Sequence, residues 1–143
     1  MKISTKGRYG LRAMLDLAVY SKGSHVSLFN IAERQNISVN YLEQVFSSLR
    51  KGGLVNSVKG AQGGYMLALN PDKIKVGDIL KCLEGDLSVV NEDNEKSNDM
   101  QRCITNCVWN TINSSINDVV NSITLENLIQ NYKGMSSYPM FYI

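Results

Sequence analysis

The sequence predicts a mainly α-helical chain with one small β-hairpin, arranged as a winged helix-turn-helix head followed by a long C-terminal helix. Three observations lead to this fold class. Two short amphipathic segments, residues 28–35 and 39–51, are separated by only three residues, and a glycine-rich hairpin follows at once. A periodic apolar seam then runs along residues 104–123. The first two features are typical of a head that enters a DNA groove, and the seam is typical of a helix that packs against a partner helix.

The length and composition of the chain restrict its class. Its 143 residues are enough for one compact domain, or for a small domain with an appendage. No stretch approaches the roughly 18 consecutive apolar residues of a membrane span, and the N-terminus lacks the apolar core of a signal peptide. The three cysteines, Cys82, Cys103 and Cys107, are an odd number without disulfide-framework spacing. We therefore expect a cytoplasmic protein without a membrane partner.

The net charge of +2 hides an asymmetry along the chain. Residues 1–82 hold twelve Lys and Arg against five Asp and Glu, a net +7, whereas residues 83–143 hold three against eight, a net −5. A basic N-terminal part suits a nucleic-acid-binding head, and the acidic remainder suits a section that does not touch DNA. A merely soluble surface is the alternative interpretation of the same charges.

The first helix is expected over residues 6–20, with Thr5 as its N-cap and residues 21–25 ending it. Its apolar residues recur at i, i+3, i+4, i+7 and i+8, which predicts one buried face. These residues are Leu11, Met14, Leu15, Ala18 and Val19.

The next two helices are bounded by strong capping signals. Ser27 is placed to cap residues 28–35, which Asn36 ends in a left-handed conformation, and Ser38 is placed to cap residues 39–51. The Gly52-Gly53 pair stops the third helix. Two helices this close together predict a helix-turn-helix, in which the second helix enters the major groove.

The third helix separates its apolar and polar residues onto two sides. The apolar side consists of Val39, Leu42, Val45, Phe46 and Leu49, and the polar side of Asn40, Glu43, Gln44 and Ser47. Asn, Gln and Ser can hydrogen-bond base edges in the major groove, and Glu can accept a hydrogen bond from cytosine. The polar side is therefore interpreted as a base-reading surface. An ordinary solvated helix face is the alternative.

The hairpin is expected to have strands at residues 54–58 and 65–69, with the sequence KGAQGG as its tip. Gly60 and Gly63 allow a close approach of the backbone to a partner. Lys59 and Gln62 are placed in or over a minor groove, with tip amides on phosphates. A nucleotide-binding phosphate loop is excluded, because no Gly-Lys-Ser/Thr ends the tip and a strand follows it.

The remainder of the chain is predicted to return to the head and then to dimerise. Residues 76–83 form a short helix in which Cys82 is a small buried hydrophobe, which completes a DNA-binding domain of residues 1–84. Residues 85–99 are an acidic mobile loop, residues 100–131 a dimerisation helix with a short last helix capped by Thr124, and residues 132–143 an irregular tail. The seam of the long helix consists of Ile104, Val108, Ile112, Ile116, Val119 (or Val120) and Ile123.

These residues resemble the Rrf family of winged-helix transcriptional regulators along essentially the whole chain. The most specific motifs are MKISTKGRYGLRAM, SVNYLEQVFSSLRKGGLV, SVKGAQGGYML and VGDILKCLEG. The resemblance implies a homodimer whose long C-terminal helix crosses between subunits, and hence a palindromic double-stranded DNA site. The resemblance implies base or groove contacts by Asn40, Glu43, Gln44 and Lys59, and it matches Lys6, Arg8 and Tyr9 to a backbone-contacting segment. The whole predicted DNA-contacting set is Lys6, Arg8, Tyr9, Ser38, Asn40, Tyr41, Glu43, Gln44, Ser47, Arg50, Lys59, Gly60, Gln62 and Gly63.

The iron–sulfur branch of this family implies a [2Fe–2S] cluster, but the sequence departs from its ligand pattern. Cys103 matches the last cysteine ligand, whereas Asn106 stands at the histidine position and residues 87–102 contain no cysteine. We therefore expect no cofactor and no metal, with a cluster using inter-subunit or loop carboxylate ligands as the alternative. Cys103 and Cys107 could instead be redox-responsive, with a pKa lowered by a helix start, or be buried in a dimer seam. His25 is interpreted as an ordinary loop residue.

The C-terminal residues resemble the cysteine-metabolism branch of the family. Met140, Phe141, Tyr142 and Ile143 form an apolar end with a free carboxylate. The resemblance implies a complex with cysteine synthase (O-acetylserine sulfhydrylase), in which such an end is captured by a pocket. A tail that folds onto its own dimer is the alternative.

Together these features predict a homodimeric DNA-binding repressor of cysteine and sulfur metabolism genes, modulated by cysteine synthase. Two alternatives stay open: an iron–sulfur or thiol-based redox-sensing regulator, and an adaptor that uses the head only for protein contacts. An enzyme is not expected, because the sequence offers no nucleophile–base set, metal triad or nucleotide loop.

Overall fold

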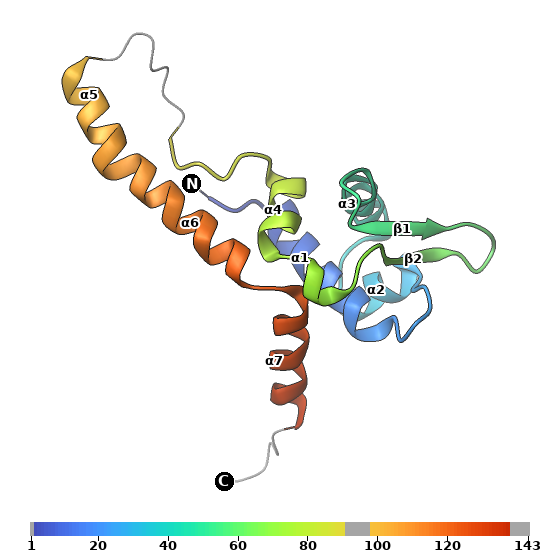
Figure 1. The fold of residues 1–143 in the computed structure, drawn as a ribbon. Coiled ribbons are helices and arrows are strands. Elements are labelled where there is room, and N and C mark those ends of the chain that lie inside the picture. The colour runs from blue at the N-terminus through green and yellow to red at the C-terminus, as the bar shows by residue number, and fades with distance from the viewer. Residues whose placement is uncertain (1, 91–97, 138–143) are drawn as a thin grey trace.

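The computed structural model describes residues 2–90 and 98–137, and it places the head and the C-terminal helices as distinct parts of the molecule (Figure 1). The head contains α1 (Thr5–Tyr20), α2 (Leu28–Gln35), α3 (Val39–Lys51), the strands β1 (Val55–Val58) and β2 (Gly64–Leu67), a 3₁₀ turn (Pro71–Lys73) and α4 (Val76–Glu84). α5 (Asp99–Ile104), a π-helical segment (Thr105–Trp109) and α6 (Asn110–Ser122) form one long arm, which α7 (Leu125–Ser137) follows. None of these helices is long and apolar enough to cross a membrane.

The capping predictions for α2 and α3 are confirmed. The Ser27 hydroxyl accepts a hydrogen bond from the Asn30 amide, and the Ser38 hydroxyl accepts one from the Tyr41 amide, each at 3.1 Å. Asn36 ends α2 with φ 55° and ψ 50°, the left-handed conformation expected of it. The turn between the two helices is therefore set by local chemistry.

The expected cap of α1 was placed one residue too late. The helix begins at Thr5, and the N-cap is Ser4, whose hydroxyl accepts from the Gly7 amide at 3.4 Å. Glu84 at the end of α4 provides the physical reason, because its carboxylate accepts from the Ser4 amide at 2.9 Å and from the Gly7 amide at 3.0 Å. Hydrogen bonds to Glu84, 80 residues away from Ser4, thus fix the residue at which α1 begins.

The core lies where α1, α3 and α4 meet. The predicted apolar side of α3 is confirmed, since Leu42, Val45, Phe46 and Leu49 are fully buried. The predicted face of α1 is only partly right. Met14 is fully buried, but Leu11, Leu15 and Ala18 are half-buried, whereas Ala13 and Leu17 are fully buried. α1 is surrounded by α2, α3, α4 and α7, so it has no single inward face.

The wing is a two-stranded antiparallel hairpin with Val55 opposite Leu67 and Val58 opposite Gly64. Its strands are shorter than expected at the ends farthest from the tip. A third backbone segment joins it, because Val26 and Tyr65 exchange two hydrogen bonds of 2.8 and 2.9 Å. A Cβ on Gly64 would lie 2.2 Å from the Val26 carbonyl oxygen, so glycine is required for this approach.

The long helix and the cap of the last helix are confirmed, but the last helix is longer than predicted. The Thr124 hydroxyl accepts from the Asn127 amide at 3.1 Å. α7 then continues to Ser137, so the irregular tail predicted from Tyr132 is wrong for residues 132–137. Tertiary packing explains the extension, since Leu125 and Ile129 are buried and the Tyr132 hydroxyl hydrogen-bonds Tyr20 of α1.

The segment between α4 and the arm was expected to be mobile. Of its residues, 85–90 pack between α4 and α6: Leu87 is buried with Val76 and Leu80, and the Val89 amide donates to Asn113 Oδ1 at 2.8 Å. Residues 91–97 lie outside the described part of the chain.

Candidate nucleic-acid interface

The polar side of α3 is its outward side. Asn40, Glu43 and Gln44 are exposed, and Ser47 is half-buried beside them. The opposite side of the same helix carries the fully buried Leu42 and Phe46, so α3 cannot turn without losing its core contacts. Ser38 is exposed at the start of the helix and Arg50 near its end. The structure therefore presents hydrogen-bonding side chains on a rigid helix, as groove recognition requires.

The start of α1 lies beside this helix. Lys6 Nζ donates to Ser48 Oγ at 3.1 Å, which places its ammonium group against the flank of α3. The rings of Tyr9 and Tyr41 meet edge to face at 6.1 Å between centroids, and both are half-buried. Arg8 is exposed, and its guanidinium donates to Thr5 Oγ1 at 3.2 Å. Two cations and two tyrosines from the sequence-predicted set thus lie where α1 meets α3.

The wing stands next to α3 and is joined to it through Tyr65 of β2. Figure 1 shows the strands extending from the head beside α3 to an open tip. The rings of Phe46 and Tyr65 pack at 5.0 Å between centroids, which ties β2 to the recognition helix. At the tip Lys59 and Gln62 are exposed, and Gly60 has φ +116°, a conformation that side chains disfavour.

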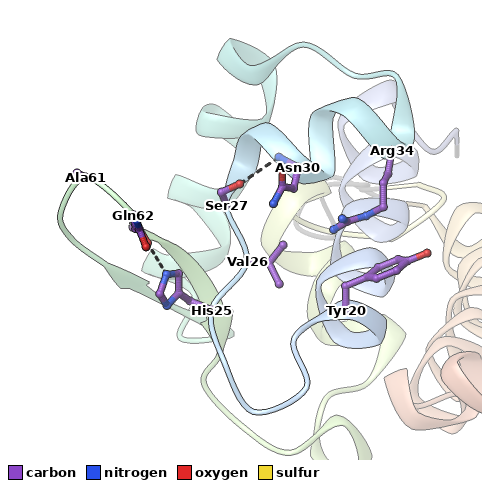
Figure 2. Close-up of a pocket in the computed structure, with 9 residues that line it drawn as sticks. Tyr20, His25, Val26, Ser27, Asn30, Arg34, Ala61 and Gln62 are labelled. Carbon is purple, nitrogen blue, oxygen red and sulfur yellow. Dashed lines mark hydrogen bonds between the residues drawn. The ribbon is translucent and has the colours of Figure 1, made fainter.

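Sequence reasoning missed His25 as a part of this interface. The ring Nε2 of His25 bonds the backbone carbonyl oxygen of Gln62 at the wing tip, 37 residues away (Figure 2). These two residues line an open pocket together with Tyr20, Asn30 and Arg34. No local sequence signal predicts such a contact, because it depends on the path of the loop before α2.

An ion pair fixes α2 against α1 behind the recognition helix. The Asp16 carboxylate is buried and accepts from Arg34 Nε at 3.0 Å, from Arg34 Nη2 at 2.8 Å and from Gln35 Nε2 at 2.8 Å. The hydrogen bond to Asp16 raises the pKa of the Arg34 guanidinium, which also lies 4.0 Å above the ring of Tyr20. The helix-turn-helix is therefore attached to α1 by a charged, hydrogen-bonded group as well as by apolar packing.

The three thiols lie in two different environments. Cys82 is half-buried against the core and its thiol donates to the Ser48 carbonyl at 3.1 Å, in line with the prediction of a small packed side chain, and burial raises its pKa. Cys103 and Cys107 are exposed in the single chain. A hydrogen bond with Cys103 raises the pKa of the Cys107 thiol, so the predicted lowering by a helix start is wrong for Cys107, which follows α5 in the π-helical segment.

The residues of the described part of the chain do not fit an iron–sulfur cluster. Cys103 and Cys107 supply two thiols, and within residues 2–90 and 98–137 no group of three or more Cys, His, Asp or Glu side chains is positioned to hold a metal ion. A [2Fe–2S] cluster needs about four protein ligands. The loop carboxylates Glu92, Asp93 and Glu95 fall outside the described residues, so the donor set in view is insufficient.

A helix-turn-helix with an outward polar second helix, flanked by a basic hairpin, defines a winged-helix regulator. The family model described as Rrf2, iron-dependent transcriptional regulator, matches residues 3–131. This chain belongs to the Rrf2 family of transcriptional regulators, as the resemblance seen in the sequence predicted.

Two groups of relatives are similar to the chain. The regulator CymR of Bacillus subtilis (strain 168) is 53% identical over 97 residues, which are 66% of this chain and 70% of CymR. The regulator IscR of Pectobacterium atrosepticum is 42% identical over 132 residues, which are 92% of this chain and 80% of IscR. These relatives are transcriptional regulators and not enzymes.

The solved structures support the same grouping. The structure of CymR (YrzC), the global cysteine regulator of B. subtilis, has a TM-score of 0.78 at 44% identity and covers 92% of this chain and 98% of its own. The structure of T. potens IscR has a TM-score of 0.77 at 44% identity, and the match covers 99% of this chain and 95% of that IscR chain. The winged-helix fold class is therefore confirmed.

Proposed function

We propose that this protein is a homodimeric DNA-binding repressor of cysteine and sulfur metabolism genes, and that its DNA affinity is modulated by a complex with cysteine synthase. The observation that carries the DNA-binding part is the outward face of Asn40, Glu43 and Gln44 on a helix flanked by the wing. Similarity to a global cysteine regulator supports the choice of genes.

The proposed division of labour follows from side-chain chemistry. α3 lies in the major groove, where Asn40 and Gln44 can pair with adenine and Glu43 can accept from cytosine. Lys59 and Gln62 of the wing reach the minor groove. The remaining predicted residues position the head on the phosphates or lie at the contact surface: Lys6, Arg8, Tyr9, Ser38, Tyr41, Ser47, Arg50, Gly60 and Gly63.

Substitutions in these two regions should have distinguishable effects. Gln44→Ala should weaken binding to the cognate site by about 1–3 kcal/mol and reduce discrimination at one base pair, because it removes a base contact. Lys59→Ala should weaken binding to all sequences and lower the slope of log K against log salt by about 1, because it removes a cation from the DNA. Fluorescence titrations at several salt concentrations measure both quantities.

Lys133→Ala is the matched control, since it removes an exposed lysine from α7 rather than from the head. It should leave the salt slope unchanged. Equal behaviour of the Lys59 and Lys133 variants would contradict the proposed role of the wing. Absent or salt-insensitive binding by the unmodified protein would favour the adaptor function instead.

The exposed side of the arm supports the proposed homodimer. Apolar side chains remain uncovered along it in the single chain: Met100, Ile104, Val108, Ile112 and Val119. A groove lined by Ile112, Ile116, Val119 and Val120 lies on the same helix. An exposed apolar surface of this kind indicates an interface. A second copy of the arm would cover it and give the two-fold symmetry that a palindromic DNA site requires.

The effect of cysteine synthase binding is proposed to reach the head through α7, the helix that leads into residues 138–143. The proposed partner-binding residues Met140, Phe141, Tyr142 and Ile143 lie outside the described part of the chain. The Tyr132 hydroxyl of α7 hydrogen-bonds Tyr20, and the Tyr20 ring lies under the Arg34 guanidinium of α2. These contacts provide a physical connection between the segment that carries the tail and the helix-turn-helix.

The function is tested by titrating a palindromic promoter fragment with and without cysteine synthase and O-acetylserine. Cysteine synthase should change the DNA affinity, and DNA should change the affinity for cysteine synthase by the same factor. A variant that lacks residues 140–143 should bind DNA alone as the full chain does but should not respond to the enzyme. An unchanged response of that variant would exclude the tail as the contact.

Thiol-based sensing is the second candidate for the input, because Cys103 and Cys107 are exposed and hydrogen-bonded to one another. The same titration after peroxide treatment separates the two inputs. Under thiol sensing, peroxide would alter the DNA affinity of the unmodified protein and leave a Cys103→Ser, Cys107→Ser double variant unaffected.

A further inference from the structure

The wing is held to the rest of the head at two nearby residues, Tyr65 at the tip end of β2 and Gln62 in the tip itself. The Tyr65 ring packs on Phe46 of α3. The Tyr65 backbone exchanges two hydrogen bonds with Val26. The His25 ring bonds the carbonyl of Gln62. Val26 and His25 both belong to the loop before α2, which lies beside β2 (Figure 2).

The tip requires an external attachment because its own sequence leaves it free. A two-stranded hairpin is marginally stable on its own. Gly60 has φ +116°, and the Gly63 amide donates to the Gly60 carbonyl at 3.0 Å, which closes a turn without side-chain packing. Lys59 and Gln62 are exposed. Among the described residues, the bond from His25 therefore attaches the tip to a part of the head outside the two strands.

The backbone that carries the His25 side chain is well anchored. Val26 follows it directly, is buried, and is paired with Tyr65 on both its amide and its carbonyl. His25 itself is half-buried. Because a backbone carbonyl only accepts, Nε2 carries the proton in this bond. The acceptor is the main chain of Gln62, so the side chain of Gln62 stays available for DNA.

We propose that His25 is a positioning residue of the DNA-binding wing: its bond to the Gln62 carbonyl holds the tip in the conformation that presents Lys59 and Gln62 to the minor groove. This inference rests on the proposed DNA-binding function of the wing. A tip ordered before DNA arrives loses less conformational entropy on binding than a free tip. Removal of the donor should therefore weaken DNA binding roughly tenfold.

The test compares two substitutions that differ in one property. His25→Phe keeps a ring but removes the donor, whereas His25→Gln carries an amide N–H at about the reach of Nε2. Gln62→Ala is the matched control at the other end, because it removes the side chain and keeps the carbonyl. His25→Ala repeats the loss of the donor if the Phe ring disturbs the fold, and thermal unfolding checks every variant.

The first readout is DNA affinity in a double-mutant cycle of His25→Phe with Lys59→Ala. Lys59→Ala should weaken binding less in the His25→Phe background than in the unmodified protein, because a free tip no longer presents the lysine. His25→Gln should restore most of the affinity. Additive effects of the two substitutions would overturn the proposal, since His25 would then act independently of the wing.

The second readout is amide hydrogen exchange of residues 59–63 without DNA. Exchange should accelerate several-fold in His25→Phe, and it should stay unchanged in Gln62→Ala. Unchanged exchange in His25→Phe would overturn the positioning role even if DNA affinity fell. This measurement does not depend on DNA, so it separates failure of the attachment from failure of the proposed function.

Discussion

A Val119→Glu substitution on α6 is expected to convert the protein from a dimer into a monomer and to weaken binding to a palindromic site by about two orders of magnitude or more. Val119 is 58% exposed in the single chain, so its replacement leaves the fold of the subunit intact. In the proposed dimer the same position is covered, and a carboxylate buried there without a partner is strongly unfavourable. A monomer also loses the avidity of two linked half-sites, about 10²–10⁴-fold.

Sedimentation equilibrium and DNA titration measure these two effects. Ser114→Glu is the matched control, because it introduces the same charge at an exposed position on the other side of α6 from Ile112. This variant should remain dimeric. A dimeric Val119→Glu protein with unchanged DNA affinity would show that the exposed side of the arm is not the interface.

Loss of the buried carboxylate is expected to cause the second large effect. Asp16→Ala should lower the free energy of unfolding by about 3 kcal/mol, because it leaves the Arg34 guanidinium and the Gln35 amide without their acceptor. This expected loss of unfolding free energy lies toward the lower end of the range for buried ion pairs that have lost one partner. The Arg34 side chain is 31% exposed and can recover part of its hydration.

Urea unfolding followed by circular dichroism measures this loss. Asp118→Ala, at an exposed position of α6, removes the same charge from the surface and should change stability by no more than about 0.5 kcal/mol. Equal stabilities of the two variants would mean that the ion pair with Arg34 does not hold α2 to α1. DNA binding by the Asp16 variant should fall in step with the folded fraction.

Much of the head could be predicted because its signals are local. Ser27, Asn36 and Ser38 set the ends of α2 and α3 through contacts within three residues in sequence or through their own backbone conformation. The period of apolar residues selected the buried side of α3, and the polar side followed from it. The glycines between the strands marked the wing tip. These features depend on neighbours along the chain, which a sequence displays directly.

Two of the errors share one cause, a partner far away in the sequence. The cap of α1 moved to Ser4 because the Glu84 carboxylate binds its first turn. The last helix extended to Ser137 because α7 packs on α1, where Tyr132 meets Tyr20. The direction of the Cys107 pKa was mispredicted for a local reason, because its thiol interacts with that of Cys103 one helical turn earlier, which raises the pKa of Cys107.

The sequence by itself determined that this protein has a helix-turn-helix with a polar recognition face, a glycine-tipped wing and an apolar arm. Capping, periodicity and glycine content act between residues that are close in the sequence, so their structural effects can be predicted from the sequence. Only the tertiary structure decided how the wing is held. His25 and Val26 reach Gln62 and Tyr65 across about 40 residues, and such a contact exists only after the loop before α2 has been placed against β2.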